Sequence, residues 1–366
     1  MRVLNLEHDL CLATEEVNFI PPGPVVEFAR RCRWLERFMR APEGEEGRIV
    51  PWGWNMQLRE RLIKEGVPEG ELPAREELEF IKENSRREVA VELLAFLNGI
   101  SRSGSSCVYR DCIPTAGAEG RADSTAGGGI FESISPGYRI VAHSLQEIEG
   151  FLQEKGKVVL KAPLSGSGKG VRFVTNELME TDIGWCRRVL ARQGAVIVEE
   201  RLDVVQEFAM LFEVSSCSKP ECADMKDMGT KGAAGMVADV TKFVGYSMFY
   251  ASNGAYKGNL LASNEYIEEF LGGDIGRELL VAVKENIKSF LSGRLAGRYT
   301  GFVGVDMFIY RNSRGRVLLN PAVEINMRMT MGLIARNIYD FHREEFQLGE
   351  GTHCFEPERG IFPIEQ

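Results

Sequence analysis

Helical spacing of apolar residues dominates the first third of the chain. Three helical stretches are expected, at residues 24–39, 55–65 and 76–98. Gly66 and Gly99 mark the ends of the second and third, and a short strand is expected before all three, at residues 2–6. These elements predict a small α/β unit at the start of the chain.

Short apolar runs and polar turns predict a regular mixture of strands and helices from residue 138 onward. Strands are expected at 138–142, 157–161, 171–175, 195–199, 207–214, 301–310 and 316–326. Ser144 caps one helix with Glu147 as its capping-box partner, and further helices are expected at 183–193 and 275–291. Further short strands are expected in the Gly-rich region 229–258.

Composition narrows the class of protein. The chain has 366 residues, 44% hydrophobic and 27% charged, which is typical of a globular protein with two or three domains and excludes collagen-like or coiled-coil architecture. The net charge of -9 argues against nucleic acid and anionic membranes as partners. No stretch approaches the roughly 20 apolar residues of a membrane span. The first residues lack a signal-peptide pattern and the eight cysteines form no CxxC pair, so a cytoplasmic location is expected.

The first candidate site is a strand that ends in Lys161 and continues into a glycine-rich loop. Residues 158–171 read VVLKAPLSGSGKGV. Glycines let backbone N–H groups approach phosphate oxygens, and the lysine adds positive charge. Pro163 stands where a Walker A loop needs glycine, Val171 where a dinucleotide fingerprint needs it, and a protein kinase places its lysine after the loop. A flexible surface hairpin is the alternative interpretation.

The second candidate site follows an apolar strand. Residues 195–203 read AVIVEERLD, so the strand runs into the paired carboxylates of Glu199 and Glu200. Such a segment suits a hinge between two lobes, where backbone groups meet an adenine edge and a carboxylate meets ribose hydroxyls. A solvated strand end is the alternative.

The third candidate site is a set of oxygen ligands on a hairpin. Asp306 lies in GFVGVDMFIY, and Glu324 and Asn326 lie in LLNPAVEINMRM, with a polar turn between the two strands. Glu324 and Asn326 are two apart and share a face; Asp306 joins it if residues paired across the hairpin have numbers with an even sum. Pro321 is a candidate for a bulge that sets this register. Two carboxylates and an amide oxygen predict a magnesium site.

The order of these sites resembles the ATP-grasp superfamily over residues 138–335. An earlier segment, NSRREVAVELLAFL, is similar to the family's helix that begins with a basic residue. The resemblance implies an α/β (α+β) fold, namely an ATP-grasp fold of two lobes preceded by a small α/β domain. The implied parts are an N-terminal domain at 1–113, a Gly/Ala/Ser-rich loop at 114–137, a first lobe at 138–203, a second lobe with the metal site at 204–345, and a C-terminal tail at 346–366.

The resemblance implies a nucleotide site in the first lobe. Lys161 would contact the α- and β-phosphates of ATP, and Arg87, or Arg86, would supply another phosphate-contacting cation. The loop that closes over the phosphates would comprise Ser165, Gly166, Ser167, Gly168, Lys169 and Gly170. Adenine would be held by Glu199 with the backbone near Glu200 and Leu202, and ribose by Glu207.

In the second lobe the resemblance implies the metal and reaction centre. Asp306, Glu324 and Asn326 would hold one or two Mg²⁺ ions, with Mn²⁺ as the alternative ion, and Arg328 would lie near the transferred phosphoryl group or the acyl phosphate.

The activity implied by the resemblance is that of an ATP- and Mg²⁺-dependent, ADP-forming ligase. It would join a small-molecule carboxylate to an amine, or to a thiol, through an acyl phosphate. It would need neither nucleic acid nor membrane, and a homo-oligomer is compatible with it. Two alternatives stay open: a phosphotransferase acting on a small molecule, and a nucleotide-binding module without turnover.

Overall fold

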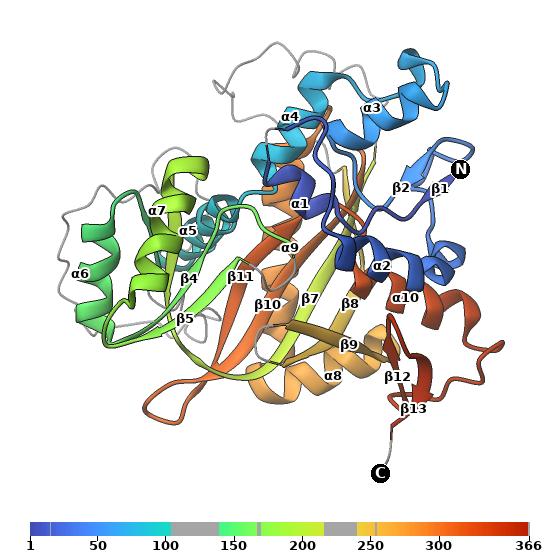
Figure 1. The fold of residues 1–366 in the computed structure, drawn as a ribbon. Coiled ribbons are helices and arrows are strands. Elements are labelled where there is room, and N and C mark those ends of the chain that lie inside the picture. Colours follow the sequence, from blue (N-terminus) through green and yellow to red (C-terminus); the bar gives the residue numbers. More distant parts are fainter. Residues whose placement is uncertain (15, 104–138, 167–169, 216–239, 253–254, 365–366) are drawn as a thin grey trace.

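Two antiparallel sheets form two lobes, and a smaller unit at the N-terminus packs beside them (Figure 1). The computed structural model describes residues 1–14, 16–103, 139–166, 170–215, 240–252 and 255–364. The predicted loop at 114–137 lies outside the described residues, as do Ser167, Gly168 and Lys169.

The larger lobe is built on a seven-stranded sheet in the order β11-β10-β7-β8-β9-β12-β13. Its strands are β7 (Asp203–Val214), β8 (Thr241–Ser252), β9 (Ala255–Leu261), β10 (Gly301–Arg311), β11 (Val317–Asn326), β12 (His353–Glu356) and β13 (Gly360–Pro363). The β10–β11 hairpin appears where the sequence predicts it. Short strands are expected around 229–258, but β8 is twelve residues long, because it pairs with β7 along one edge and with β9 along the other.

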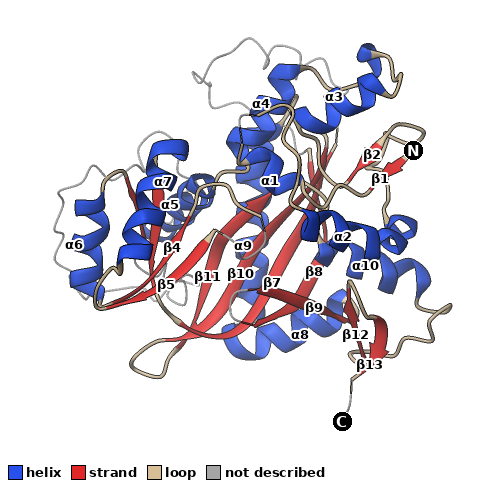
Figure 2. Ribbon diagram, in the orientation of Figure 1, coloured by secondary structure: helices blue, strands red, loops and turns tan. Residues whose placement is uncertain are grey.

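Helices cover both faces of this sheet (Figure 2). The central strand β7 shows why: Phe208, Met210 and Phe212 face one core, and Ala209 and Leu211 face the other. The first core is shared with α4 (Arg75–Asn84), α5 (Arg87–Ser103), α8 (Asn264–Ile275) and α9 (Arg277–Leu295). The second core is shared with the 3₁₀ helix η1 (Arg33–Phe38) and with α10 (Met331–His342).

The smaller lobe is a four-stranded sheet in the order β3-β6-β4-β5 with two helices on one face. Its elements are β3 (Arg139–Ala142), α6 (Leu145–Lys155), β4 (Lys157–Lys161), β5 (Val171–Thr175), α7 (Glu180–Gln193) and β6 (Val196–Glu200). Leu160 and Val198 pack under the helices, so Lys161 and Glu199 point to the opposite face. The predicted cap is present. Ser144 Oγ accepts a hydrogen bond from the backbone amide of Glu147, and the Glu147 carboxylate accepts one from the backbone amide of His143.

The N-terminal unit departs from two of the predicted helices. Its elements are β1 (Arg2–Val3), α1 (His8–Leu12), α2 (Gly23–Arg31), β2 (Val50–Pro51), α3 (Met56–Lys64) and the 3₁₀ helix η2 (Glu69–Glu71). The stretch 24–39 is not one helix, because α2 ends at Arg31 and, after the cap residue Cys32, the 3₁₀ helix η1 begins at Arg33. The stretch 76–98 divides into α4 and α5, because the Ser85 hydroxyl bonds back to the Ile81 carbonyl and closes α4.

Among the described residues, no helix has both the length and the apolar character needed to cross a membrane.

Candidate active site

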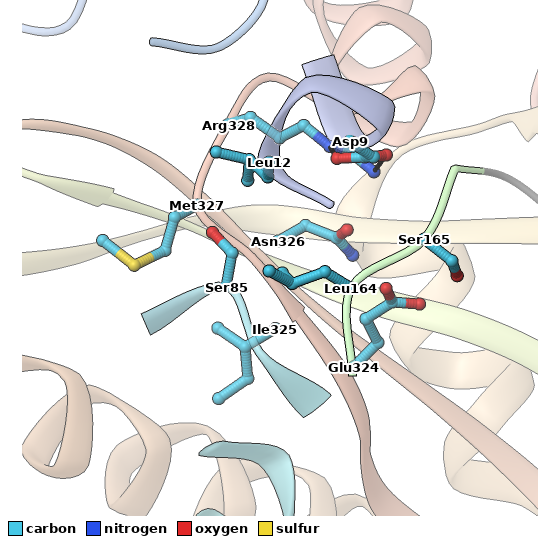
Figure 3. A pocket seen from close by; sticks show the side chains of 10 residues that line it. All are labelled: Asp9, Leu12, Ser85, Leu164, Ser165, Glu324, Ile325, Asn326, Met327 and Arg328. Atoms are coloured by element: carbon cyan, nitrogen blue, oxygen red, sulfur yellow. Dashed lines mark hydrogen bonds and ion pairs between the residues drawn. The ribbon is translucent and has the colours of Figure 1, made fainter. Parts of the chain in front are cut away.

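A crevice lies where the two lobes and the N-terminal unit meet (Figure 3). Its lining comes from α1, the end of α4, the loop after β4, and the end of β11. The lining residues are Asp9, Leu12, Ser85, Leu164, Ser165, Glu324, Ile325, Asn326, Met327 and Arg328. Residues more than 300 positions apart in the chain therefore share one site.

The predicted oxygen ligands stand together on the β10–β11 hairpin. Asp306 pairs directly with Glu324 across the two strands, which is the even-sum register that puts both on one face. Asn326 donates a hydrogen bond from Nδ2 to Asp306 Oδ2 at 3.1 Å. The register shifts between Asp306 and Phe308, where Asp306 faces 324 but Phe308 faces 320, so Pro321 lies in the bulge.

The electrostatics of this trio suit a bound cation. Burial, together with the nearby Glu324 charge, raises the pKa of Asp306 to about 7. Asp306 and Glu324 contribute carboxylate oxygens, and Asn326 keeps its amide oxygen free because its nitrogen serves Asp306. This donor set fits a hard divalent ion such as Mg²⁺.

Arg87 joins the smaller lobe to β11. Its guanidinium donates to the Ala162 carbonyl, to Ser165 Oγ at 2.9 Å and to Glu324 Oε2 at 3.1 Å. Arg86, the alternative cation, points elsewhere: it pairs with Glu88 at 2.6 Å and with the Gln193 carbonyl at 2.8 Å. The geometry therefore favours Arg87 as the cation at the crevice.

Lys161 forms a buried ion pair with Glu199, with Nζ 2.7 Å from Oε2. Burial lowers the pKa of Lys161, an effect that the Glu199 charge partly offsets. Burial alone would raise the pKa of Glu199, but Arg139 and Lys161 hold it below its usual value. The sequence predicts that Lys161 and Glu199 both belong to the nucleotide site, but it does not predict the ion pair between them.

The remaining nucleotide candidates among the described residues lie on β6, on β7, in the turn between them and at the two ends of the loop between β4 and β5. Ser165 and Gly166 follow β4, and Gly170 returns the loop to β5, where its carbonyl accepts from the Ala162 amide at 2.8 Å. A side chain at Gly170 would overlap Ser165, which explains the glycine there. Glu207 lies on β7 opposite Phe308, and burial raises its pKa. Glu200 ends β6, and Leu202 lies in the turn to β7.

Arg328 is held by a residue that the sequence does not identify as functional. Its guanidinium forms a two-pronged ion pair with Asp9, with Nε 2.7 Å from Oδ1 and Nη2 2.8 Å from Oδ2. Burial would raise the pKa of Asp9, but Arg328 holds it below its usual value. The sequence gives only a weak sign of this role, namely the two acidic residues that flank His8. It does not show the pairing, because Asp9 and Arg328 are 319 positions apart.

His8 is buried beside this ion pair. Asn55 Nδ2 donates to His8 Nδ1 at 3.0 Å, and His8 Nε2 has no hydrogen-bond partner among the described residues. Burial lowers the pKa of His8 to about 4, so the ring is neutral at pH 7. The ring packs against Gly53, where an added Cβ would lie 2.6 Å from Nδ1.

We expect Gly53→Ala to lower the free energy of unfolding by about 2 kcal/mol, because the methyl group would overpack the His8 ring. Gly70→Ala is the matched control, since a Cβ there meets nothing within 4 Å. Urea unfolding of both variants measures the difference. Equal stability of the two variants would contradict the close packing of His8 on Gly53.

Comparisons with known proteins give only distant likenesses. No protein-family model and no curated protein matches the chain. Among solved structures it is similar to N5-carboxyaminoimidazole synthetase from Staphylococcus aureus complexed with ADP, at 12% identity and TM-score 0.34, over 63% of this chain and 46% of that one. D-alanyl-alanine synthetase A from Vibrio cholerae is 12% identical with TM-score 0.41, over 82% and 74%. A biotin carboxylase–β-γ-ATP complex from Campylobacter jejuni is 12% identical with TM-score 0.43, over 93% and 60%.

The chain spans less than half the length of the first structures that it matches. The predicted α+β class is confirmed by the chain's own helices and antiparallel sheets. With TM-scores below 0.5 the likenesses carry no argument about activity, which rests on the side chains in the crevice.

Proposed function

We propose that the chain is an ATP- and Mg²⁺-dependent ligase that joins a carboxylate to an amine and releases ADP. The observation that carries the proposal is the convergence of an oxygen-ligand set and two cations at one crevice between two lobes. Glu324, Asn326 and Arg328 line the crevice, Asp306 pairs with Glu324, and Arg87 donates to Glu324. A third cation, Lys161, lies near enough to Arg87 for their charges to interact. Proteins that stabilise a transferring phosphoryl group need such a concentration of positive charge.

Each side chain then has a role toward the nucleotide. Lys161 and Arg87 bind phosphate oxygens, together with Ser165, Gly166 and Gly170 at the two ends of the glycine-rich loop. The backbone at the end of β6, from Glu199 to Leu202, holds adenine, and Glu207 holds ribose. Asp306, Glu324 and Asn326 hold Mg²⁺ or Mn²⁺, which when bound neutralises charge on the phosphate oxygens.

The reaction proceeds in two displacements. A carboxylate oxygen of the first substrate attacks the γ-phosphorus, the bond to ADP breaks, and an acyl phosphate forms. The amine nitrogen then attacks the acyl carbon, phosphate leaves, and the surplus proton passes to solvent. Arg328, held in the crevice by Asp9, faces the charge of the acyl phosphate. A thiol in place of the amine would give a thioester by the same steps.

Product analysis tests the reaction class. The protein is incubated with ATP, Mg²⁺ and mixed small carboxylates, amines and alcohols in the neutral, reducing buffer appropriate to a cytoplasmic enzyme. ADP with a new amide supports the ligase, a phosphorylated alcohol supports the phosphotransferase, and ATP binding without product across all substrates supports the binding module. The last two outcomes contradict the proposal.

We expect Lys161→Met to weaken ATP binding by about 10- to 100-fold, because it removes a charged hydrogen-bond donor from the phosphates. Lys157→Met is the matched control, since Lys157 is exposed at the other end of the same strand. Calorimetric titration of ATP measures both variants. An unchanged dissociation constant for Lys161→Met would remove this residue from the nucleotide site.

A further inference from the structure

Three charged side chains lie side by side on the cleft face of the smaller sheet. Glu199 on the central strand β6 pairs in register with Arg139 on β3, and Lys161 reaches it from β4 on the other side. Residues paired across antiparallel strands share a face. The carboxylate therefore stands between two cations that come from two different strands.

The geometry of this triad is closely defined. Arg139 Nε lies 2.9 Å from Glu199 Oε1, and Lys161 Nζ lies 2.7 Å from Glu199 Oε2. The exposed fractions of the three side chains are 3% for Arg139, 9% for Glu199 and 11% for Lys161. Each carboxylate oxygen thus has its own cationic partner, out of contact with bulk water.

Arg139 also reaches the other lobe. Its Nη1 donates to the Ala322 carbonyl at 2.8 Å, and Ala322 lies on β11, two residues before Glu324. The third guanidinium nitrogen, Nη2, is buried without a hydrogen-bond partner in the described part of the chain. Arg139 is therefore held at β11 by a contact that does not involve Lys161.

The triad has a net positive charge, because the single negative charge of Glu199 is paired with two cations, Arg139 and Lys161. Arg87 adds a further cation nearby, and its charge also acts on Lys161 and Glu199. A buried carboxylate left without a partner is strongly destabilising, whereas one that keeps a hydrogen-bonded cation is not. Lys161 can leave Glu199 at small cost only if Arg139 stays.

We propose that Arg139 is a positioning residue that keeps Glu199 paired and so frees Lys161 to bind an anionic ligand. The ligand class, a nucleoside triphosphate, rests on the proposed function. Arg139 itself does not contact the phosphates; it acts through Glu199. Without Arg139, Lys161 would be the ion-pair partner of Glu199. Moving Lys161 to a phosphate would then leave the buried Glu199 carboxylate without a partner.

Calorimetric titration of ATP with Mg²⁺ tests this role in four variants. Arg139→Gln should weaken binding by about 10- to 100-fold, since among the described residues it leaves Lys161 as the one ion-pair partner of Glu199. Arg139→Lys keeps the charge and should restore most of the affinity. In the Glu199→Gln background the same Arg139→Gln change should have little effect, because a neutral amide no longer competes for Lys161.

The outcomes separate this inference from the proposed function. If the wild-type protein binds no ATP, both fail. If the wild type binds ATP and Arg139→Gln binds it equally well, or if the loss persists in the Glu199→Gln background, the positioning role alone is overturned. Should Arg139→Gln not fold, a crystal structure of the wild type with an ATP analogue decides. The proposal expects Glu199 on Arg139 and Lys161 on phosphate, and a Lys161–Glu199 pair retained beside bound nucleotide overturns it.

Discussion

Glu324→Gln is expected to reduce Mg²⁺-dependent turnover of ATP by about a thousandfold while the protein stays folded. Glu324 lies directly opposite Asp306 on the hairpin, and it also accepts hydrogen bonds from Arg87. Glutamine keeps the size of the side chain and an oxygen for Arg87 but removes the negative charge. We therefore expect the change to weaken the binding of the metal ion and the positioning of the phosphates more than it affects packing.

The control for this variant is Glu278→Gln, because Glu278 is exposed on α9, away from the crevice. Steady-state ADP production gives the activity, and thermal unfolding verifies that the fold is intact. Added Mn²⁺ gives a second readout, since a weakened metal site responds to the identity and concentration of the ion. Near-normal turnover of folded Glu324→Gln would exclude Glu324 from the mechanism.

Arg328→Met is expected to have two separable effects, a loss of stability and a loss of turnover. It leaves Asp9, whose side chain is 26% exposed, without its two-pronged partner, and should lower the free energy of unfolding by about 2 kcal/mol. It also removes a cation from the crevice, and we expect turnover to fall by about 100-fold or more.

The double variant Asp9→Asn/Arg328→Met distinguishes these effects. It removes both charges, so stability should return toward that of the wild type, whereas turnover should stay low because the crevice still lacks its cation. Urea unfolding and ADP production on the same samples measure the two quantities. If turnover returns together with stability, Arg328 has only a structural role, and its assignment to the acyl phosphate is wrong.

Much of the fold could be predicted because its strands are short apolar runs bounded by clear turns. The predicted strands at 157–161 and 171–175 coincide with β4 and β5. Helix α8 is absent from the prediction because two adjacent glycines, Gly272 and Gly273, interrupt its apolar pattern. Helix α10, which Thr330 caps, is also absent from the prediction. Both helices are stabilised by burial against other parts of the fold, and the local sequence does not show this burial.

The candidate site could be predicted where its residues are close in the chain. Glu324 and Asn326 share a strand face by their spacing alone, and the hairpin turn brings Asp306 to them. Asp9 and Arg139 could not be found in this way. Each belongs to the site only through a partner that is far away in the chain, and the register or ion pair that joins them exists only in the folded protein.

The most direct test of the central claim is a crystal structure with a non-hydrolysable ATP analogue and Mn²⁺, whose anomalous signal locates the ion. The account predicts the nucleotide between the two lobes, its phosphates on Lys161 and Arg87, and an anomalous peak in direct contact with Asp306 and Glu324. A nucleotide bound elsewhere, or an ion that avoids both carboxylates, would contradict it.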